Sequence, residues 1–334
     1  MINTYAALEA KQLLAPYNYT PNKLAPFDVE IAITHCGICH TDLHLIDNDW
    51  GISSYPLVPG HEIIGTIISK GAEVTWLEKG QRVGIGAQSG ACMSCSYCET
   101  GEEHLCDQHQ PTCLGKFGGF ANAIICDGRF AFLLPEKLDA ARTAPLLCGG
   151  ATVYSPLRRF IQRPSMRVGI IGIGGLGHMA IQFAKAFECE ITAFSTSPDK
   201  EQEARQLGAT HFVSSVDISQ SKQLASYFDL IIDTAPNPLP WGHYINMLKP
   251  KSFLCIVGLP SAKIDISAGS LIRCNRGICG SNIAGSHEIK EMLQLAEKHN
   301  IGAVVETFPL SAVNEAIKKV KENKIRYRAV LTME

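Results

Sequence analysis

The stretch RVGIIGIGGLGHMAIQFAKAF, residues 167–187, decides the fold of the second part of this 334-residue chain. An apolar run leads into GIGGLG, which satisfies the pattern G-x-G-x-x-G, and an amphipathic helical pattern follows. Glycines at this spacing permit a tight turn and let the backbone approach a pyrophosphate, whose charge the helix N-terminus stabilises. A glycine-rich turn without a ligand is the alternative, but the flanking strand and helix are the context that dinucleotide binding requires. We therefore predict a dinucleotide site that includes Gly172, Gly174, Gly175, Leu176 and Gly177.

The pattern around this motif predicts an α/β protein. From residue 166 onward, apolar strands alternate with helical segments. Repeated β-then-α units imply a doubly wound parallel sheet covered on both faces. The first part of the chain differs, because residues 62–71 and 81–86 are β-branched runs punctuated by glycine, as expected of a compact barrel-like region.

The residues at the end of the second strand of this region favour NADP(H) over NAD. The strand ends in Ser195, Thr196 and Ser197, and Lys200 is nearby, so no acid stands at the strand end. NAD sites usually place an acid there, which would repel a 2′-phosphate, whereas hydroxyls and a lysine can bind one. Asp199 leaves NAD open, because a small loop shift would bring it to the ribose. The hydroxyls also suit a helix cap.

A closely spaced group of cysteines predicts a structural zinc site. Cys92, Cys95, Cys98 and Cys106 form C-x2-C-x2-C-x7-C in a polar segment. Four thiolates at this spacing can surround one tetrahedral Zn²⁺ and leave no open position. Two disulfides are the alternative, but the N-terminus shows no secretory signal, so a reducing cytoplasm is expected. The zinc is expected to stabilise a folded lobe at about residues 90–107 and to take no part in catalysis.

A second group of metal-binding residue types lies earlier in the chain. The run CGICHTDLH, residues 36–44, gathers thiol, imidazole, carboxylate and hydroxyl side chains, and PGHE follows at residues 59–62. The first run comes at the end of an expected strand, residues 27–37. Such a cluster indicates a second zinc site.

Composition bounds the class of protein and its partners. Hydrophobic residues make up 46% and charged residues 19%, as in folded globular proteins. The formal net charge of −2 gives no reason to expect nucleic acid or an anionic membrane as partner. The longest apolar stretch, residues 168–187, is broken by five glycines and three polar side chains, so no membrane span is expected.

With these motifs in hand, the chain resembles the zinc-dependent medium-chain alcohol dehydrogenases, particularly the NADP-dependent branch of cinnamyl alcohol dehydrogenase-like enzymes and bacterial aldehyde reductases. The resemblance covers nearly the whole length. It implies a GroES-like β-barrel catalytic domain at residues 1–151 and 285–334, and a Rossmann domain at residues 152–284. The motifs that carry it occur in the family's order: GICHTDLH, GHE, the four-cysteine lobe, LLCGGATVY at 146–154, GIGGLGH and RYRAVLTM at 326–333.

The resemblance also implies a catalytic zinc. Its ligands would be Cys39, His61 and Cys148, with Glu62 as an alternative ligand, whereas Cys36 would be an ordinary buried thiol. Two thiolates and one imidazole leave a fourth position for water or substrate.

Further roles follow from the same likeness. Thr41 would bond the substrate oxygen and begin a proton relay that His44 completes, Asp42 would orient His61, and His40 would face the pyrophosphate. A surface histidine is the alternative for His44, and a helix cap for Asp42. The positions implied to line the nicotinamide or phosphates are Thr152, Val257, Ser281, Ile283 and Arg328.

The expected function is zinc-dependent hydride transfer between NADP(H) and a primary alcohol or aldehyde, as an aldehyde reductase of broad specificity with two Zn²⁺ per chain. Residues 113–125 offer no clear aromatic clamp, which argues against cinnamyl substrates, although Trp50, Trp241 and Phe117 are candidates for substrate contact. An NAD-dependent polyol or secondary-alcohol dehydrogenase is the enzymatic alternative, and a non-catalytic zinc or redox sensor is another. A cytoplasmic homodimer, joined by edge strands near residues 277–285, is expected.

Overall fold

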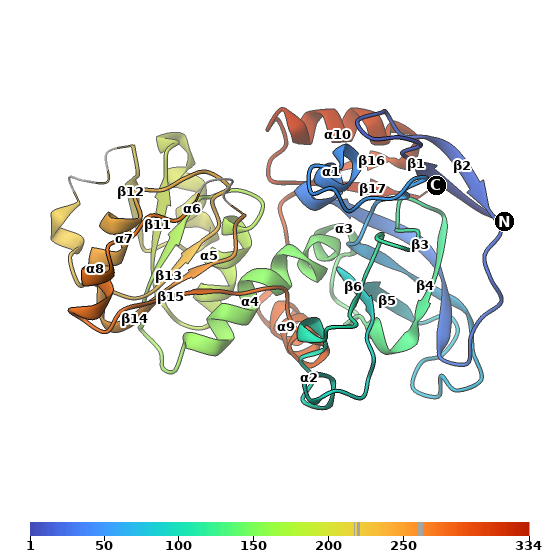
Figure 1. Cartoon of the computed structure of the whole chain (residues 1–334), viewed down its shortest axis with the longest axis horizontal. Helices are drawn as coiled ribbons and strands as arrows, with labels where there is room; N and C mark the ends of the chain where they lie inside the picture. Colours follow the sequence, from blue (N-terminus) through green and yellow to red (C-terminus); the bar gives the residue numbers. More distant parts are fainter. Residues whose placement is uncertain (217, 219–220, 260–262, 334) are drawn as a thin grey trace. The chain divides into compact units, whose positions relative to one another are not determined.

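The computed structural model describes residues 1–216, 218, 221–259 and 263–333, which form two compact units (Figure 1). Unit 1 comprises Met1–Cys148 and Ala284–Glu334, and unit 2 comprises Gly149–Ile283. In the sequence, unit 2 is therefore inserted between the two parts of unit 1.

Unit 1 is built on a largely antiparallel sheet with the strand order β16-β17-β3-β4-β5-β9, and β8 also pairs with β3. In the longest strand, β3, the alternate residues Val29, Ile31 and Ile33 are buried, which follows the period of two that a half-buried strand requires. The runs expected as strands at residues 62–71 and 81–86 are β4 and β5. The bounds are β3 Asp28–Ile38, β4 Ile63–Lys70, β5 Arg82–Ile85, β8 Ala123–Asp127, β9 Ala131–Leu133, β16 Val305–Pro309 and β17 Arg328–Thr332.

Smaller elements complete unit 1. Two short antiparallel pairs join β1 to β2 and β6 to β7. Helix α10 packs on β16 and β17, and its buried Val313 and Ile317 enter the core of the unit. The bounds are β1 Ile2–Ala6, β2 Ala15–Tyr19, β6 Gln88–Gly90, β7 Gln110–Pro111, α1 His40–Asp47, α2 Ser96–Glu99, η1 Glu103–Leu105, η2 Gly128–Phe130, α3 Ala140–Thr143, η3 Ala144–Leu147, α9 Ser286–His299, η7 Leu310–Ala312 and α10 Val313–Lys321.

Unit 2 is built on a six-stranded parallel sheet with the order β12-β11-β10-β13-β14-β15. This is the order of a doubly wound dinucleotide-binding sheet, in which the strand order reverses at the strand that precedes the glycine motif. That strand is β10, which lies between β11 and β13. The bounds are β10 Arg167–Ile171, β11 Glu190–Ser195, β12 His211–Ser214, β13 Phe228–Asp233, β14 Leu248–Ile256 and β15 Gly277–Gly280.

The helices of unit 2 connect these parallel strands. Helix α5 packs on β10 and β11, and α7 packs on β14. Aromatic side chains fill part of the core, where the rings of Phe194, Phe228 and Tyr244 are fully buried. The predicted α/β class is confirmed. The bounds are α4 Gly149–Phe160, α5 Gly177–Ala186, η4 Pro198–Lys200, α6 Glu201–Leu207, η6 Lys222–Leu224, α7 Trp241–Met247 and α8 Ala268–Ile272.

Candidate metal and cofactor sites

The start of α1 places Cys39 at the end of β3. Cys39 is the N-cap residue of the helix, and its backbone N–H donates to Asp42 Oδ2 at 2.9 Å. An acid in the first turn also suits the helix dipole. The helix ends at Asn48, which adopts the left-handed conformation with φ 54°. These two caps fix the short helix that carries Thr41, Asp42 and His44.

Four potential ligands converge within unit 1. The ligand atoms of Cys39, His61, Glu62 and Cys148 all lie within 4.8 Å of one another. Cys39 precedes α1, His61 and Glu62 lie directly before β4, and Cys148 follows η3. The structure thus brings together the residues that the resemblance implies as catalytic-zinc ligands. Cys36 is fully buried and does not belong to this group.

Asp42 orients His61 within this group. Asp42 Oδ1 lies 2.9 Å from His61 Nδ1 and accepts from the backbone N–H of Gly60 at 2.9 Å. A carboxylate can only accept, so Nδ1 carries a proton, and in the neutral imidazole that binds a metal Nε2 carries the lone pair. Nε2 is buried and has no hydrogen-bond partner among the described residues. An orphaned imidazole lone pair beside two thiols fits a metal ion.

The electrostatics of the group also favour a cation. The contact with Cys148 holds the pKa of the Cys39 thiol well below its usual range, and the pKa of Cys148 is raised by the same contact. Burial raises the pKa of Glu62 to about 7, although its buried ion pair with Arg328 opposes this change. A thiolate, an imidazole and a carboxylate enclosed together form a donor set suited to Zn²⁺.

His44 has an acidic partner that the sequence reasoning missed. His44 Nδ1 lies 2.7 Å from Asp49 Oδ2, and the rings of His44 and Trp50 are 5.0 Å apart. Thr41 and His44 are three residues apart on α1 and so share a face of the helix. An acid five residues after the histidine was a weak signal, because its position depends on the turn at Asn48. His40, at the start of α1, is exposed.

The four-cysteine lobe has the geometry of a closed metal site. Sulfurs about 2.3 Å from a tetrahedral ion lie roughly 3.8 Å apart. The separations are 3.8 Å for Cys92 and Cys98, 3.6 Å for Cys95 and Cys98, and 3.5 Å for Cys92 and Cys106. Hydrogen bonds from Ser94, its backbone N–H first, lower the pKa of Cys92 to about 6. None of the thirteen cysteines, all of which lie among the described residues, forms a disulfide.

A buried acid that sequence reasoning did not single out anchors this lobe. Glu103 is 5% exposed and accepts hydrogen bonds from the backbone N–H and the hydroxyl of Ser286, at 3.0 and 2.7 Å. Its own carbonyl accepts from Gln88 Nε2 at 2.9 Å. The lobe is thus tied both to β6 and to the start of α9.

In unit 2, the glycine motif turns tightly from β10 into α5. Gly172 has φ 86°, a left-handed conformation that favours glycine. A Cβ on Gly177 would lie 1.9 Å from the Gly172 carbonyl oxygen, so no other residue fits there. A Cβ on Gly174 would meet nothing within 4 Å, which leaves space beside the backbone. This turn and the open space fit a bound pyrophosphate.

The predicted phosphate-binding residues gather around this turn. Ser195 ends β11, and its hydroxyl accepts from the backbone N–H of Ser197 at 3.1 Å. Lys200 Nζ donates to the Ile173 carbonyl at 2.7 Å, which places its ammonium group on the glycine motif. Thr196 and Asp199 are exposed.

The other predicted positions divide between the two units. Val257 and Ser281 lie at the carboxyl ends of β14 and β15, the same edge of the sheet as the glycine motif, and Ile283 follows shortly after. Thr152 lies on α4, whereas Arg328 belongs to unit 1 and pairs with Glu62.

Two of the three aromatic candidates for substrate contact pack elsewhere. Trp241 is 4% exposed in the core of unit 2. The Phe117 ring packs against Tyr19, with ring centroids 4.4 Å apart. Trp50 is exposed.

Comparison with known proteins places this geometry in context. Residues 25–136 match the family described as alcohol dehydrogenase GroES-like domain, and residues 175–298 match the zinc-binding dehydrogenase family. The aldehyde reductase AdhA of Synechocystis is 41% identical over 332 residues, covering 99% of each chain. Among the described residues, no helix is long and apolar enough to cross a membrane.

Solved structures agree with these matches. A cinnamyl alcohol dehydrogenase from Sorghum bicolor superposes with a TM-score of 0.94 at 36% identity, covering 99% of this chain and 97% of that one. CAD from Helicobacter pylori, solved in complex with NADP(H), gives a TM-score of 0.91 at 31% identity with the same coverage.

Proposed function

Because the chain belongs to the zinc-dependent medium-chain alcohol dehydrogenases, we propose that it reduces aldehydes with NADPH at a zinc ion held by Cys39, His61 and Cys148. The observation that carries this proposal is the buried donor group in unit 1, in which the His61 Nε2 lone pair has no partner among the described residues. Glu62 is the alternative ligand, held back by its ion pair with Arg328.

Zinc fits the donor set because two thiolates and one imidazole leave one tetrahedral position open to substrate or water. When bound there, Zn²⁺ acts as a Lewis acid toward an aldehyde carbonyl. Asp42 holds the His61 tautomer that directs Nε2 into the donor group. The four cysteines of the lobe hold a second, closed Zn²⁺ that stabilises the fold.

The chain supplies the proton that aldehyde reduction requires. The oxygen that gains charge needs a donor, and the Thr41 hydroxyl is the group we assign to it. His44 lies three residues further on the same helix face and relays a proton from solvent to Thr41. Asp49 holds His44 Nδ1 at 2.7 Å and so fixes the orientation of the ring in this relay.

The residues around the glycine motif bind the cofactor. NADPH supplies the hydride for the carbonyl carbon. The glycine turn accommodates the pyrophosphate, and the Ser195 hydroxyl and Lys200 ammonium group bind the 2′-phosphate. Thr152, Val257, Ser281 and Ile283 are assigned to the rest of the cofactor.

The proposal is tested by measuring turnover of aliphatic, aromatic and sugar aldehydes with NADPH and NADH, together with the zinc content. We expect faster turnover with NADPH, activity on several aldehyde classes and two zinc ions per chain. A clear preference for NADH, with turnover confined to polyols or secondary alcohols, would favour the other enzymatic assignment. One inert zinc and no turnover of any aldehyde would favour a sensor.

A homodimer is the assembly we assign to this chain. Strand β15 forms the edge of the sheet in unit 2, so one side of its backbone has no strand partner among the described residues. The nearby Ile272 is 74% exposed. Light scattering during gel filtration is expected to give twice the 36.3 kDa chain mass, and a monomer would refute this assignment.

A reducing, cytoplasmic location is proposed because none of the thirteen cysteines, all among the described residues, forms a disulfide. Cell fractionation tests it directly, and recovery outside the cytoplasm would contradict it.

A further inference from the structure

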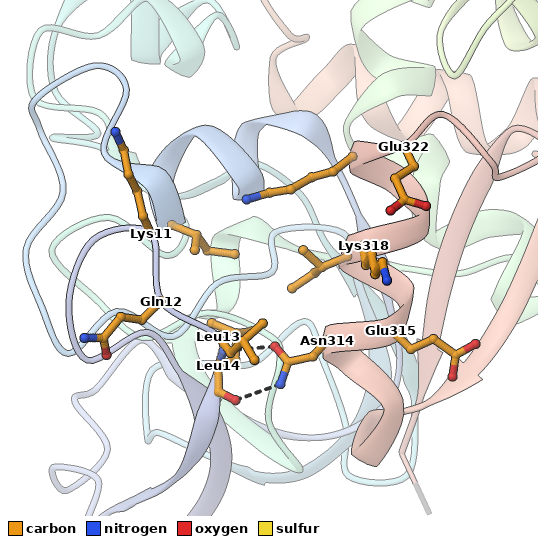
Figure 2. Close-up of a pocket in the computed structure, with 11 residues that line it drawn as sticks. Lys11, Gln12, Leu13, Leu14, Asn314, Glu315, Lys318 and Glu322 are labelled. Atoms are coloured by element: carbon orange, nitrogen blue, oxygen red, sulfur yellow. Dashed lines mark hydrogen bonds between the residues drawn. The ribbon is translucent and has the colours of Figure 1, made fainter.

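A cavity of about 540 Å³ lies in unit 1 and shares no residue with the metal and cofactor sites assigned above. It is bordered by the connection between β1 and β2, by Ile46 of α1 and by one face of α10 (Figure 2). Its size falls within the range of about 300 to 1,000 Å³ that is typical of small-molecule sites.

Hydrogen bonds hold the walls of this cavity in place. Asn314 of α10 accepts from the Leu14 backbone N–H and donates to the Leu14 carbonyl, both at 2.9 Å. Figure 2 shows these two bonds joining the helix to the loop. The Lys11 backbone N–H donates to the Ile46 carbonyl at 3.1 Å and holds Lys11 at φ 65°, an unfavourable conformation for a lysine. The cavity is therefore formed before any ligand arrives.

The floor of the cavity is apolar. Leu14, Ile46 and Ile317 lie there and are 4%, 2% and 7% exposed, while Leu13 projects at the rim and is 76% exposed. Most of the apolar surface that a ligand could still cover belongs to Leu13, and covering it gains hydrophobic free energy at about 25 cal/mol per Å². The ligand therefore needs an apolar body.

The rim carries an excess of unpaired positive charge. Lys11 and Lys318 lie on opposite sides of the cavity in Figure 2, and neither has an ion pair among the described residues. The acids at the rim have lysine partners, because Glu315 pairs with Lys319 and Glu322 pairs with Lys324, and the charge of Lys318 also helps to lower the pKa of Glu322. The remaining lysine of the lining, Lys321, pairs with Asp47 at 2.6 Å. A ligand therefore meets two ammonium groups that have no ion pair among the described residues, whereas each rim acid has a lysine partner.

We propose that this cavity is a second ligand site, which binds a small carboxylic acid with an unbranched apolar chain. The chain lies against Leu13, above the buried Leu14, Ile46 and Ile317, and the carboxylate is held by Lys11 and Lys318. Charge-assisted bonds from two ammonium groups select an anion over an alcohol or an amine of equal length. This site goes beyond the proposed reduction of aldehydes and does not depend on it.

The test compares three probes with the same apolar chain on the full-length protein: octanoate, 1-octanol and octylammonium. Isothermal titration is expected to show saturable binding of octanoate, weaker binding of 1-octanol and no binding of octylammonium. Octanoate affinity is also expected to fall as salt is added, because the lysines are exposed. Equal affinity for octanoate and 1-octanol, or absence of octanoate binding, overturns the proposal.

Variants locate the binding. The double variant Lys11→Gln/Lys318→Gln is expected to bind octanoate about fivefold or more weakly, and Leu13→Glu is expected to reverse the preference toward octylammonium. The matched control is Lys290→Gln/Lys298→Gln on α9, which removes the same charge and should leave affinity unchanged. Circular dichroism melts confirm folding of each variant. Unchanged octanoate binding in both cavity variants places the ligand elsewhere, including the zinc site, and refutes the proposal. Aldehyde turnover on the same samples judges the proposed function separately.

Discussion

His61 Nδ1 lies 2.9 Å from Asp42 Oδ1, and both side chains are buried in unit 1. The carboxylate fixes the imidazole so that the Nε2 lone pair enters the donor group with Cys39 and Cys148. Asp42 also accepts from the backbone N–H groups of Cys39 and Gly60. One side chain thus positions two of the three proposed zinc ligands.

Replacement of Asp42 by Asn is expected to weaken zinc binding at this site by about 10- to 100-fold. The amide keeps the shape but loses the charge that makes the imidazole a stronger ligand. Competition with a chromogenic chelator measures the affinity, and the zinc held by the four-cysteine lobe should remain. Asp47→Asn, on the same helix but facing Lys321, is the matched control. Equal zinc affinity in the two variants would contradict the role of Asp42.

Cys39 and Cys36 provide a second matched pair. Cys39→Ser is expected to lose one zinc ion of two and to reduce kcat/KM by about a thousandfold or more, since the Lewis acid is lost. Cys36 is fully buried, and its Sγ donates to the Gly37 carbonyl at 3.6 Å. Cys36→Ser should therefore retain both zinc ions and lose only some stability. Elemental analysis measures the zinc content and steady-state kinetics give kcat/KM. A fully active Cys39→Ser enzyme would refute the ligand set.

Lys200 is expected to determine the preference for NADPH. Its ammonium group lies on the glycine motif, and loss of a charge-assisted bond to a phosphate costs about 1.5 to 3 kcal/mol. Lys200→Ala should raise the KM for NADPH by about 10- to 100-fold while the KM for NADH changes little. Lys222→Ala, elsewhere in unit 2, serves as the control. An equal rise in KM for NADPH and NADH would show that Lys200 stabilises the glycine turn and does not bind the 2′-phosphate.

The parts of the site that could be predicted from the sequence are those set by local geometry. The glycine motif is one, because Gly177 lies against the Gly172 carbonyl only five residues away. The four cysteines are another, because short loops alone bring their sulfurs together. In both cases the short separation along the sequence determines how close the residues lie in space.

The contacts that were missed depend on distant parts of the chain. Arg328 and Glu62 are 266 residues apart, and they meet because β17 pairs with β3, which sets Ala329 opposite Ile38. The resemblance implied a cofactor contact for Arg328 but no partner in the metal site. Asp49 meets His44 only because Asn48 takes a left-handed conformation between them. No short sequence motif predicts the strand register or this turn.

Asp233 gives a prediction on the pH dependence of stability. It ends β13, it is fully buried, and its Oδ2 has no hydrogen-bond partner among the described residues. Burial raises its pKa from the ordinary 3.8 to about 6, although the backbone N–H of Ala235 donates to Oδ1. The folded state therefore binds the proton more tightly than the unfolded state. Stability from this group is complete below about pH 4 and is lost as the pH rises through about 6.

Asp233→Asn should remove this loss, because an amide is neutral at every pH and its oxygen can still accept from Ala235. The free energy of unfolding of the variant, relative to the natural protein, should rise by about 3 kcal/mol between about pH 4 and about pH 7. Urea unfolding of both proteins at each pH measures the difference in their free energies of unfolding. Loss of zinc in acid affects both proteins equally, so it cancels from this difference. Asp199→Asn, at an exposed position of the same unit, should run parallel to the natural protein. A constant difference between Asp233→Asn and the natural protein across this range would mean that Asp233 is ionised in the folded state and has a partner that offsets its burial.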